Sequence, residues 1–305
     1  MPSPEFSDYI CRGFIRTVLM SAPPASLDDL RREIDAIDDA LHAGLLRRAS
    51  LMERVAAAKQ GQGPASPMRP GREASVLRRL LERSAAPLAP AVVARIWREL
   101  TAAALSLQGP LSVAVCGQSR SVGYWDLARN HFGSSTPMTL HVSPMVALRH
   151  VVEQPGGLAV VPLPQEGERD PWWRAMLSDD AAAPRILWRL PFFASLTGRF
   201  EDLGAFVVGH AAPEPTGRDV SVVAFETSPA MSRARLLDEL KKQGLAARIL
   251  ATHEDGTSRL NLVEIDDFVA RTDPRLDGVA AACEQDLLRI VVLGAYPMPM
   301  DSSRR

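Results

Sequence analysis

The sequence predicts a multidomain α plus α/β protein with a helical N-terminal region, an α/β middle region and a ferredoxin-like C-terminal domain. Helical periodicity runs from 26 to 108, and strand and helix patterns alternate from 111 to about 210. From 219 onward the order is strand, helix, strand, strand, helix, strand, which is the split βαβ order. We therefore expect a disordered tail at 1–25 and domains at 26–109, 110–211 and 219–298.

The helical region begins with one long amphipathic helix. Ser26, with Asp29 three residues later, is typical of a helix N-cap, and apolar residues then recur at three- and four-residue steps as far as Val55. The helix would have about 33 residues and a length of about 50 Å. Two shorter helices, expected at 71–84 and 90–108, cannot cover its apolar stripe alone. The pattern favours helix exchange or dimerisation.

The two following regions are predicted from short apolar runs and the residues that break them. After Gly109 and Pro110 we expect strands at LSVAVCG, GLAVVPLP and GAFVVGH, and helices at WDLARNHFG and SPMVALRHVVEQ. The Pro- and Gly-rich stretch AAPEPTGRD is expected to be a linker to the C-terminal domain.

Composition argues against several classes of protein. The chain has 305 residues in which 35 Lys+Arg balance 36 Asp+Glu, so we expect no nucleic acid and no membrane as partner. No apolar run approaches the ~18 residues of a membrane span, and the first residues make a poor signal peptide, with Met20 as an alternative start. Three cysteines, Cys11, Cys116 and Cys283, lie far apart and show no metal-ligand spacing, which is typical of a reducing, cytoplasmic environment.

Two cations lie on the apolar stripe of the long helix. On a helical wheel Arg48 and Lys59 both fall within it, and Lys59 is one of only three lysines among the 35 basic residues. Buried cations cost free energy unless an anion meets them, and a separation of about 16 Å would let both side chains touch one ligand. The alternative is structural: the stripe ends early, Lys59 reaches water from a frayed end, and Arg48 pairs with Glu53 or Asp38.

The helical region carries further polar residues, namely Arg31, the adjacent Arg72 and Glu73, and Gln108. Together with the segments LRREIDAIDDALHAGLLRR, RPGREASVL and IWRELTAAALSLQ, this spacing resembles the all-helical class of chorismate mutases. Such domains are found at the N-terminus of bifunctional chorismate mutase/prephenate dehydratase proteins. The resemblance implies three-helix chains in an intertwined homodimer with shared active sites.

The implied reaction is the rearrangement of chorismate to prephenate, which needs no nucleophile, metal or cofactor. Catalysis then comes from holding the dianion in its reactive conformer and from stabilising charge on the breaking ether oxygen. Arg31 lies about 25 Å along the helix from Arg48, so it is expected to serve the pocket of the other subunit. The resemblance assigns the two carboxylates to Arg48 and to Arg31 of the partner subunit, the pocket mouth to Arg72, the ether oxygen to Lys59 and Gln108, and the ring hydroxyl to Glu73.

Two positions depart from the family pattern. Arg69 stands where an acidic residue is common near the substrate hydroxyl, and Ala104 stands where a serine is common. Because both positions concern secondary contacts, we expect altered affinity rather than loss of the reaction.

The rest of the chain resembles known domains only in part. The middle region resembles the first lobe of a prephenate dehydratase, truncated, and it reads Gly204-Ala205-Phe206 where the family has Thr-Arg-Phe. We therefore expect a degenerate, inactive dehydratase-like domain. The final region resembles an ACT domain, which in this family binds an aromatic amino acid, but its ligand-binding turns depart from the pattern. An aromatic amino acid is one candidate effector, and a role in dimerisation is the alternative.

Three hypotheses follow. The first is an active chorismate mutase of the shikimate pathway, in aromatic amino acid biosynthesis, with a vestigial dehydratase half. The second is a non-catalytic regulatory or binding protein that keeps the pocket, and the third is a complete bifunctional chorismate mutase/prephenate dehydratase. Chorismate turnover separates the first from the second, and phenylpyruvate formation would establish the third.

Overall fold

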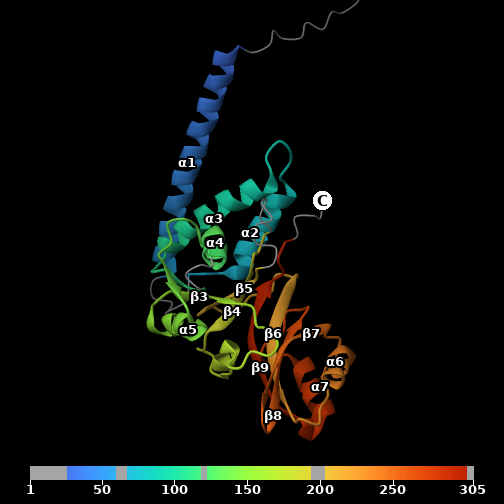
Figure 1. The fold of residues 1–305 in the computed structure, drawn as a ribbon. Helices are drawn as coiled ribbons and strands as arrows, with labels where there is room; N and C mark the ends of the chain where they lie inside the picture. The colour runs from blue at the N-terminus through green and yellow to red at the C-terminus, as the bar shows by residue number, and fades with distance from the viewer. Residues whose placement is uncertain (1–25, 60–66, 118–121, 194–202, 301–305) are drawn as a thin grey trace, which may run out of the picture. The chain divides into compact units, whose positions relative to one another are not determined.

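The computed structural model describes residues 26–59, 67–117, 122–193 and 203–300 (Figure 1). The chain divides into two compact units, with the division between Ser50 and Leu51. The predicted tail at 1–25, which includes Met20 and Cys11, lies outside the described residues.

The helix α1 spans Leu27–Lys59 and has 33 residues, as predicted. It begins with a reciprocal cap: Ser26 Oγ accepts from the Asp29 N–H at 3.1 Å, and Asp29 Oδ2 accepts from the Ser26 N–H at 3.1 Å. No residue of α1 is buried. The large apolar side chains of its stripe from Leu27 to Leu45 are 43–62% exposed, so within the described residues of one chain the stripe stays open to water. None of the described helices is long and apolar enough to cross a membrane.

A nine-stranded sheet occupies most of the second unit, in the spatial order β2-β1-β3-β5-β4-β9-β6-β8-β7. Its strands are β1 (Ser112–Cys116), β2 (Met138–His141), β3 (Gly157–Pro162), β4 (Arg185–Leu190), β5 (Ala205–Gly209), β6 (Asp219–Thr227), β7 (Ala247–Asp255), β8 (Ser258–Ile265) and β9 (Leu287–Pro297). β1 pairs parallel with β2 and β3, whereas β5 pairs antiparallel with both β3 and β4. The sequence patterns predicted neither β2, which is a short edge strand, nor β4.

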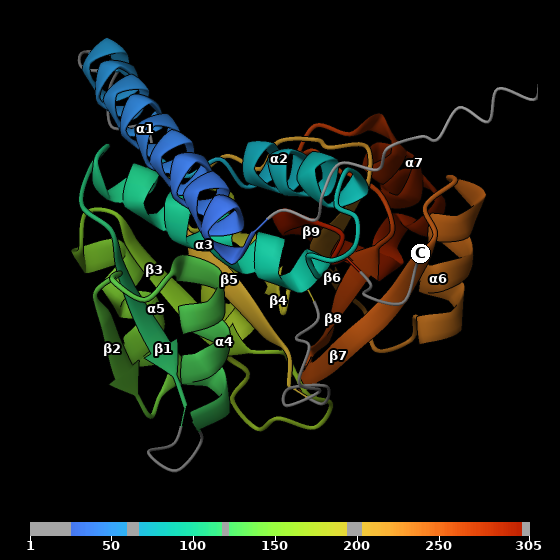
Figure 2. The same ribbon diagram turned by 90° about the horizontal axis from the view of Figure 1, so that it is seen from above.

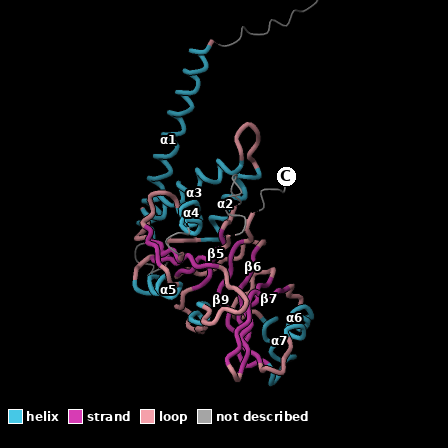
Figure 3. The backbone as a smooth tube through the Cα atoms, viewed as in Figure 1, coloured by secondary structure: helices cyan, strands magenta, loops and turns pink. Residues whose placement is uncertain are grey.

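Two further helices connect the first strands. These are α4 (Val122–Phe132), which follows β1, and α5 (Pro144–Glu153), which precedes β3. Both were predicted, and strands and helices alternate in the order β1-α4-β2-α5-β3. Figure 3 distinguishes the helices from the strands by colour.

Alternate residues of each strand face opposite sides of the sheet. Leu158 and Val160 of β3 belong to one core, and Ala159 and Val161 belong to the core on the other face. The second core also contains the buried Trp172 and Trp173 of a short 3₁₀ turn, Trp172–Met176. These tryptophans are therefore core residues.

The helices α2 (Pro70–Glu82) and α3 (Pro90–Ser106) are the predicted shorter helices, and each has a proline in its first turn (Figure 2). Leu77 of α2 and Leu105 of α3 share one core with Trp188 of β4 and Val207 of β5. The two helices therefore pack directly on the sheet.

The last four strands form an antiparallel group in the order β9-β6-β8-β7. Two helices, α6 (Arg233–Lys242) and α7 (Pro274–Cys283), lie side by side against it (Figure 1), and their core includes Leu240 and Val279. The predicted order of strand, helix, strand, strand, helix, strand is confirmed.

This antiparallel group joins the first five strands through a narrow seam. β4 pairs with β9 in parallel at one position, Ile186 with Gly294. The buried carboxylate of Glu264 strengthens the seam, since it accepts from Arg189 Nη1 of β4 at 3.1 Å and from the Tyr296 hydroxyl of β9. The predicted boundary at 211–219 thus falls between strands of one sheet.

The stretch predicted as a linker is packed against α2. Arg69, just before α2, pairs with Glu214 at 2.6 Å. The buried Arg78 donates to Thr216 Oγ1 at 2.9 Å and to the carbonyl oxygen of Met298 at 2.9 Å. We call residues 211–219 the strap, because they fasten α2 to the start of β6.

The Gly294→Ala substitution is expected to weaken the seam. Gly294 has φ of +149°, and an added Cβ would lie 2.3 Å from the carbonyl oxygen of Ile186. Strain and displaced backbone should lower the free energy of unfolding by about 2 kcal/mol. Chemical denaturation measures this loss, with Gly109→Ala as the control because a Cβ there meets nothing within 4 Å. Equal stability of the two variants would contradict a tightly closed seam.

Candidate functional site

Two of the predicted site residues meet in the second unit. Lys59, the last residue of α1, donates through Nζ to Gln108 Oε1 at 3.0 Å. Gln108 follows the end of α3, and its Nε2 donates to the carbonyl oxygen of Ala104 at 2.9 Å. Both side chains are partly buried. Lys59 is therefore held by a specific partner rather than reaching freely into water.

The orientation of the Gln108 amide follows from its partners. A flipped amide would set Nε2 against the Lys59 ammonium, donor against donor, and Oε1 against the carbonyl oxygen of Ala104. An ammonium group has three N–H donors, so Lys59 can bind an acceptor oxygen and keep Gln108. Gln108 Nε2 has two N–H donors and uses one of them on Ala104, so it keeps a second donor for an acceptor oxygen.

Arg72 and Glu73 lie in the first turns of α2 and point differently. Arg72 is exposed, whereas the Glu73 side chain is only 13% exposed and accepts from Arg98 Nη1 of α3 at 3.4 Å. Glu73 Oε2 takes this bond, while Oε1 is buried and has no hydrogen-bond partner among the residues that the structure describes. Glu73 thus keeps one acceptor oxygen free.

Burial dominates the electrostatics of this pair. Desolvation raises the pKa of Glu73 to about 7, although the charge of Arg98 and a backbone hydrogen bond from Arg69 both oppose the shift. Desolvation likewise lowers the pKa of Arg98 to about 10, against the attraction of Glu73. Arg98 therefore stays a cation at neutral pH, and Glu73 is poised between its two forms.

Arg98 is a site residue that the sequence analysis missed. Its guanidinium carbon lies 4.8 Å from the ring centroid of Trp188 and 5.2 Å from that of Phe192. The available signal was its place between Ala94 and Ala102, at four-residue steps on the face of α3 that is buried. Small neighbours leave room for a large planar group, but a single arginine on such a face is easily taken for a surface residue.

The two remaining predicted arginines belong to α1 in the first unit. Arg31 is exposed and pairs with Asp28 at 3.2 Å, one turn earlier. Arg48 is half-buried, and desolvation lowers its pKa.

The two positions that depart from the family pattern have structural contacts. Arg69 faces the strap through Glu214, and the backbone carbonyl of Ala104 accepts from Gln108. Neither contact requires the acidic residue or the serine that is common in the family.

The dehydratase-like positions show no catalytic arrangement among the described residues. Ala205 and Phe206 open β5 between β3 and β4, and both are fully buried. Glu166, which follows β3 after a short loop, pairs with Arg233 at the start of α6 and accepts from the Thr252 N–H at 2.9 Å. These residues serve packing and the connection to the antiparallel strands.

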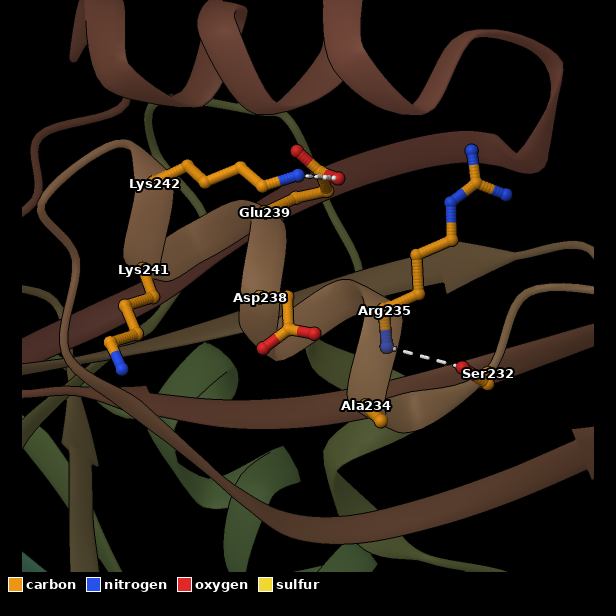
Figure 4. A pocket seen from close by; sticks show the side chains of 7 residues that line it. All are labelled: Ser232, Ala234, Arg235, Asp238, Glu239, Lys241 and Lys242. Carbon is orange, nitrogen blue, oxygen red and sulfur yellow. Dashed lines mark hydrogen bonds and ion pairs between the residues drawn. The ribbon is translucent and has the colours of Figure 1, made fainter.

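The surface of α6 bears an open hollow of about 710 Å³ (Figure 4). All of its lining residues come from 232–242, and their charges oppose one another: Lys242 Nζ donates to Glu239 Oε1 at 2.8 Å. Ser232 Oγ accepts from the Arg235 N–H as the helix cap. The hollow is therefore the charged outer face of one helix and gives no sign of a preferred ligand.

Comparison with known families places the helical region. Residues 30–109 match the family described as chorismate mutase type II. This chain therefore has an N-terminal domain of the chorismate mutase type II family, and the domain includes Lys59, the Arg72–Glu73 pair and Gln108.

Two curated relatives carry the name bifunctional chorismate mutase/prephenate dehydratase. The protein of Pseudomonas aeruginosa is 34% identical over 138 residues, 44% of this chain and 36% of the relative. That of Stutzerimonas stutzeri is 32% identical over 150 residues, 47% of this chain and 40% of the relative. The matches thus span well under half of each relative. A solved prephenate dehydratase from Streptococcus mutans is 11% identical with a TM-score of 0.45, over 62% of this chain and 98% of that one.

The raised pKa of Glu73 makes stability depend on pH. An unfolded glutamate loses its proton near pH 4.5, whereas folded Glu73 keeps it until about pH 7, so the folded state loses stability as pH rises between these values. Glu73→Gln has no such titration. The free energy of unfolding of Glu73→Gln relative to the wild type should therefore rise by about 3 kcal/mol from pH 4.5 to pH 8. Urea denaturation at both pH values measures it, and a constant difference would show that Glu73 is not buried as described.

Proposed function

We propose that this protein is a chorismate mutase that rearranges chorismate to prephenate. The observation that carries the proposal is the Lys59–Gln108 pair, 3.0 Å apart within a domain of the chorismate mutase type II family. Two hydrogen-bond donors of this kind can stabilise the negative charge that develops on one ether oxygen. Glu73 Oε1 supports the proposal, because it is a buried acceptor without a hydrogen-bond partner among the described residues and a substrate hydroxyl would supply the donor that it lacks.

The roles divide between charge stabilisation and binding. Lys59 supplies a compact positive charge to the ether oxygen, and Gln108 supplies a neutral second donor through the N–H of Nε2 that Ala104 does not use. Glu73 binds the ring hydroxyl. Arg48 and Arg72 bind carboxylate, for which a planar guanidinium is suited. No group in this scheme forms a covalent bond to the substrate, and no cofactor takes part.

We propose further that the protein works as a homodimer with shared active sites. The apolar stripe of α1 is too exposed for a stable single chain, since its six large apolar residues between Leu27 and Leu45 are 43–62% exposed. A second copy of α1 would cover it. Arg31 of the partner subunit would then complete the carboxylate contacts of each pocket.

We assign no dehydratase activity to the α/β region, since Gly204 and Ala205 stand where the family has its Thr and Arg. The names of the curated relatives favour the bifunctional alternative, and an assay for phenylpyruvate separates the two.

The C-terminal region is proposed to be ACT-like, with an aromatic amino acid as candidate effector. Chorismate turnover measured with and without added phenylalanine or tyrosine tests it. The buried thiols Cys116 and Cys283 support a place in the cytoplasm.

The catalytic role of Lys59 can be tested directly. The wild type should convert chorismate to prephenate, and Lys59→Ala should lower kcat at least 100-fold, because the charge on the ether oxygen loses its main donor. Lys241→Ala is the matched control, since Lys241 lies on the surface of α6. Absence of turnover by the wild type, with tight chorismate binding, would instead support a non-catalytic binding protein.

The shared site predicts complementation between two inactive variants. Arg31→Ala and Lys59→Ala should each have little activity alone, but their heterodimer has one pocket with an intact Lys59 and an intact Arg31. Mixing and reassembling equal amounts should therefore restore about a quarter of wild-type activity, since half of the dimers are mixed and each has one good pocket. A mixture no more active than its components would refute the sharing of active sites.

The dimer itself can be tested by sedimentation. Ile37→Lys places a charge on the apolar stripe of α1 and should abolish the dimer, whereas Asp39→Lys, on the opposite face of α1, should not.

A further inference from the structure

Arg98 occupies an unusual position for a structural salt bridge. Its side chain is only 9% exposed, and it reaches Glu73 with one hydrogen bond of 3.4 Å. Arg98 Nη2 and Glu73 Oε1 are both buried without a hydrogen-bond partner among the described residues. A bridge selected for stability would use both nitrogens and both oxygens. This pair holds Glu73 by Oε2 and leaves Oε1 available.

The aromatic residues of the sheet region fix the guanidinium of Arg98. Trp188 is a fully buried residue of β4, and its ring packs against Phe192 at 4.9 Å and against His131 of α4 at 4.7 Å between centroids. The Arg98 guanidinium lies over both Trp188 and Phe192. The position of Arg98, and through it that of Glu73, is therefore set by residues outside the chorismate mutase family domain.

The charges around Glu73 leave Arg98 as its main counter-ion. Desolvation and the Arg98 charge both hold the pKa of His131 well below its usual range, so this imidazole is neutral at neutral pH. From the N-terminal side of α2 the backbone of Arg69 contributes one hydrogen bond. On α3, the neighbouring Glu99 is engaged by the Ser134 N–H at 3.0 Å.

We infer that Arg98 is a positioning residue for the chorismate pocket: it holds the Glu73 carboxyl group by Oε2 and leaves Oε1 without a partner among the described residues, and Trp188 and Phe192 of the α/β region hold Arg98 in turn. This inference rests on the proposed function and extends it, because it gives the dehydratase-like region a role as the platform of the mutase site. An isolated helical domain would lack that platform.

The test compares Arg98→Met with Arg98→Lys in the full-length protein. Without the cation, Glu73 should protonate at higher pH, so for Arg98→Met the acidic limb of the kcat/KM profile should move up by at least one pH unit. KM at pH 7 should rise about tenfold and recover above pH 9, where Glu73 ionises again, while kcat changes little. Arg98→Lys keeps a cation beside Glu73, so its acidic limb should stay close to that of the wild type. Arg95→Met on the same helix is the control, since Arg95 is exposed.

A double-mutant cycle separates positioning from stability. In a Glu73→Gln background, Arg98→Met should leave KM nearly unchanged, because the group that Arg98 positions is gone. Trp188→Leu keeps the charge of Arg98 but removes the ring beneath it, so it should also raise KM, by a smaller factor than Arg98→Met. This variant tests the inference if Arg98→Met does not fold. An equal KM effect of Arg98→Met in both backgrounds, or an unmoved acidic limb, would overturn the inference.

The titration of Glu73 by ¹³C NMR needs no activity. Arg98→Met should raise the pKa of Glu73 above about 7, and the assignment follows from the loss of the signal in Glu73→Gln. If the wild type does not convert chorismate but this shift is seen, the proposed function fails while the control of Glu73 by Arg98 stands. If chorismate is converted and the pKa does not move, the inference fails alone.

Discussion

The buried pair of Glu73 and Arg98 is the interaction on which the rest of the site depends. A carboxylate and a guanidinium removed from water cost free energy that only their mutual attraction and the rings of Trp188 and Phe192 offset. The pair links α2 to α3 and both helices to β4. The pair joins the same two helices, α2 and α3, that bury Leu77 and Leu105 in one core with the sheet.

Other contacts fix the position of α2. Arg69 and Arg78 fasten α2 to the strap and to the end of β9, and Glu73 fastens it to α3. Because α2 also carries Arg72 and Glu73, the same helix contacts the antiparallel strands and contributes residues to the proposed pocket. A change in the packing of the strap would therefore act first on the residues that are proposed to bind the substrate hydroxyl and carboxylate.

Much of the fold could be predicted from the sequence, because the hydrophobic period of a helix or strand and the spacing of capping residues are local features. The 33 residues of α1, its Ser26–Asp29 cap and the order of the C-terminal elements all follow from short-range patterns. The meeting of Lys59 with Gln108 followed from spacing that resembles a family. The strap was predicted as a linker because its two prolines and one glycine are typical of linkers, and its own sequence does not reveal that Arg69 and Arg78 contact it. Arg98 and β4 were missed because their partners lie far away in the chain. The apolar stripe of α1 was predicted from its period, and within the described residues it is exposed.

The central claim is that Glu73, held by Arg98, faces chorismate beside Lys59 and Gln108. A crystal structure of the Lys59→Ala variant with chorismate bound tests it most directly, because the slowed reaction keeps the substrate intact. We expect the ring hydroxyl about 2.7 Å from Glu73 Oε1, with Arg98 still on Oε2 and Gln108 Nε2 donating to the ether oxygen. Chorismate bound elsewhere, or Arg98 closing on both oxygens of Glu73 with the hydroxyl turned away, would contradict the account.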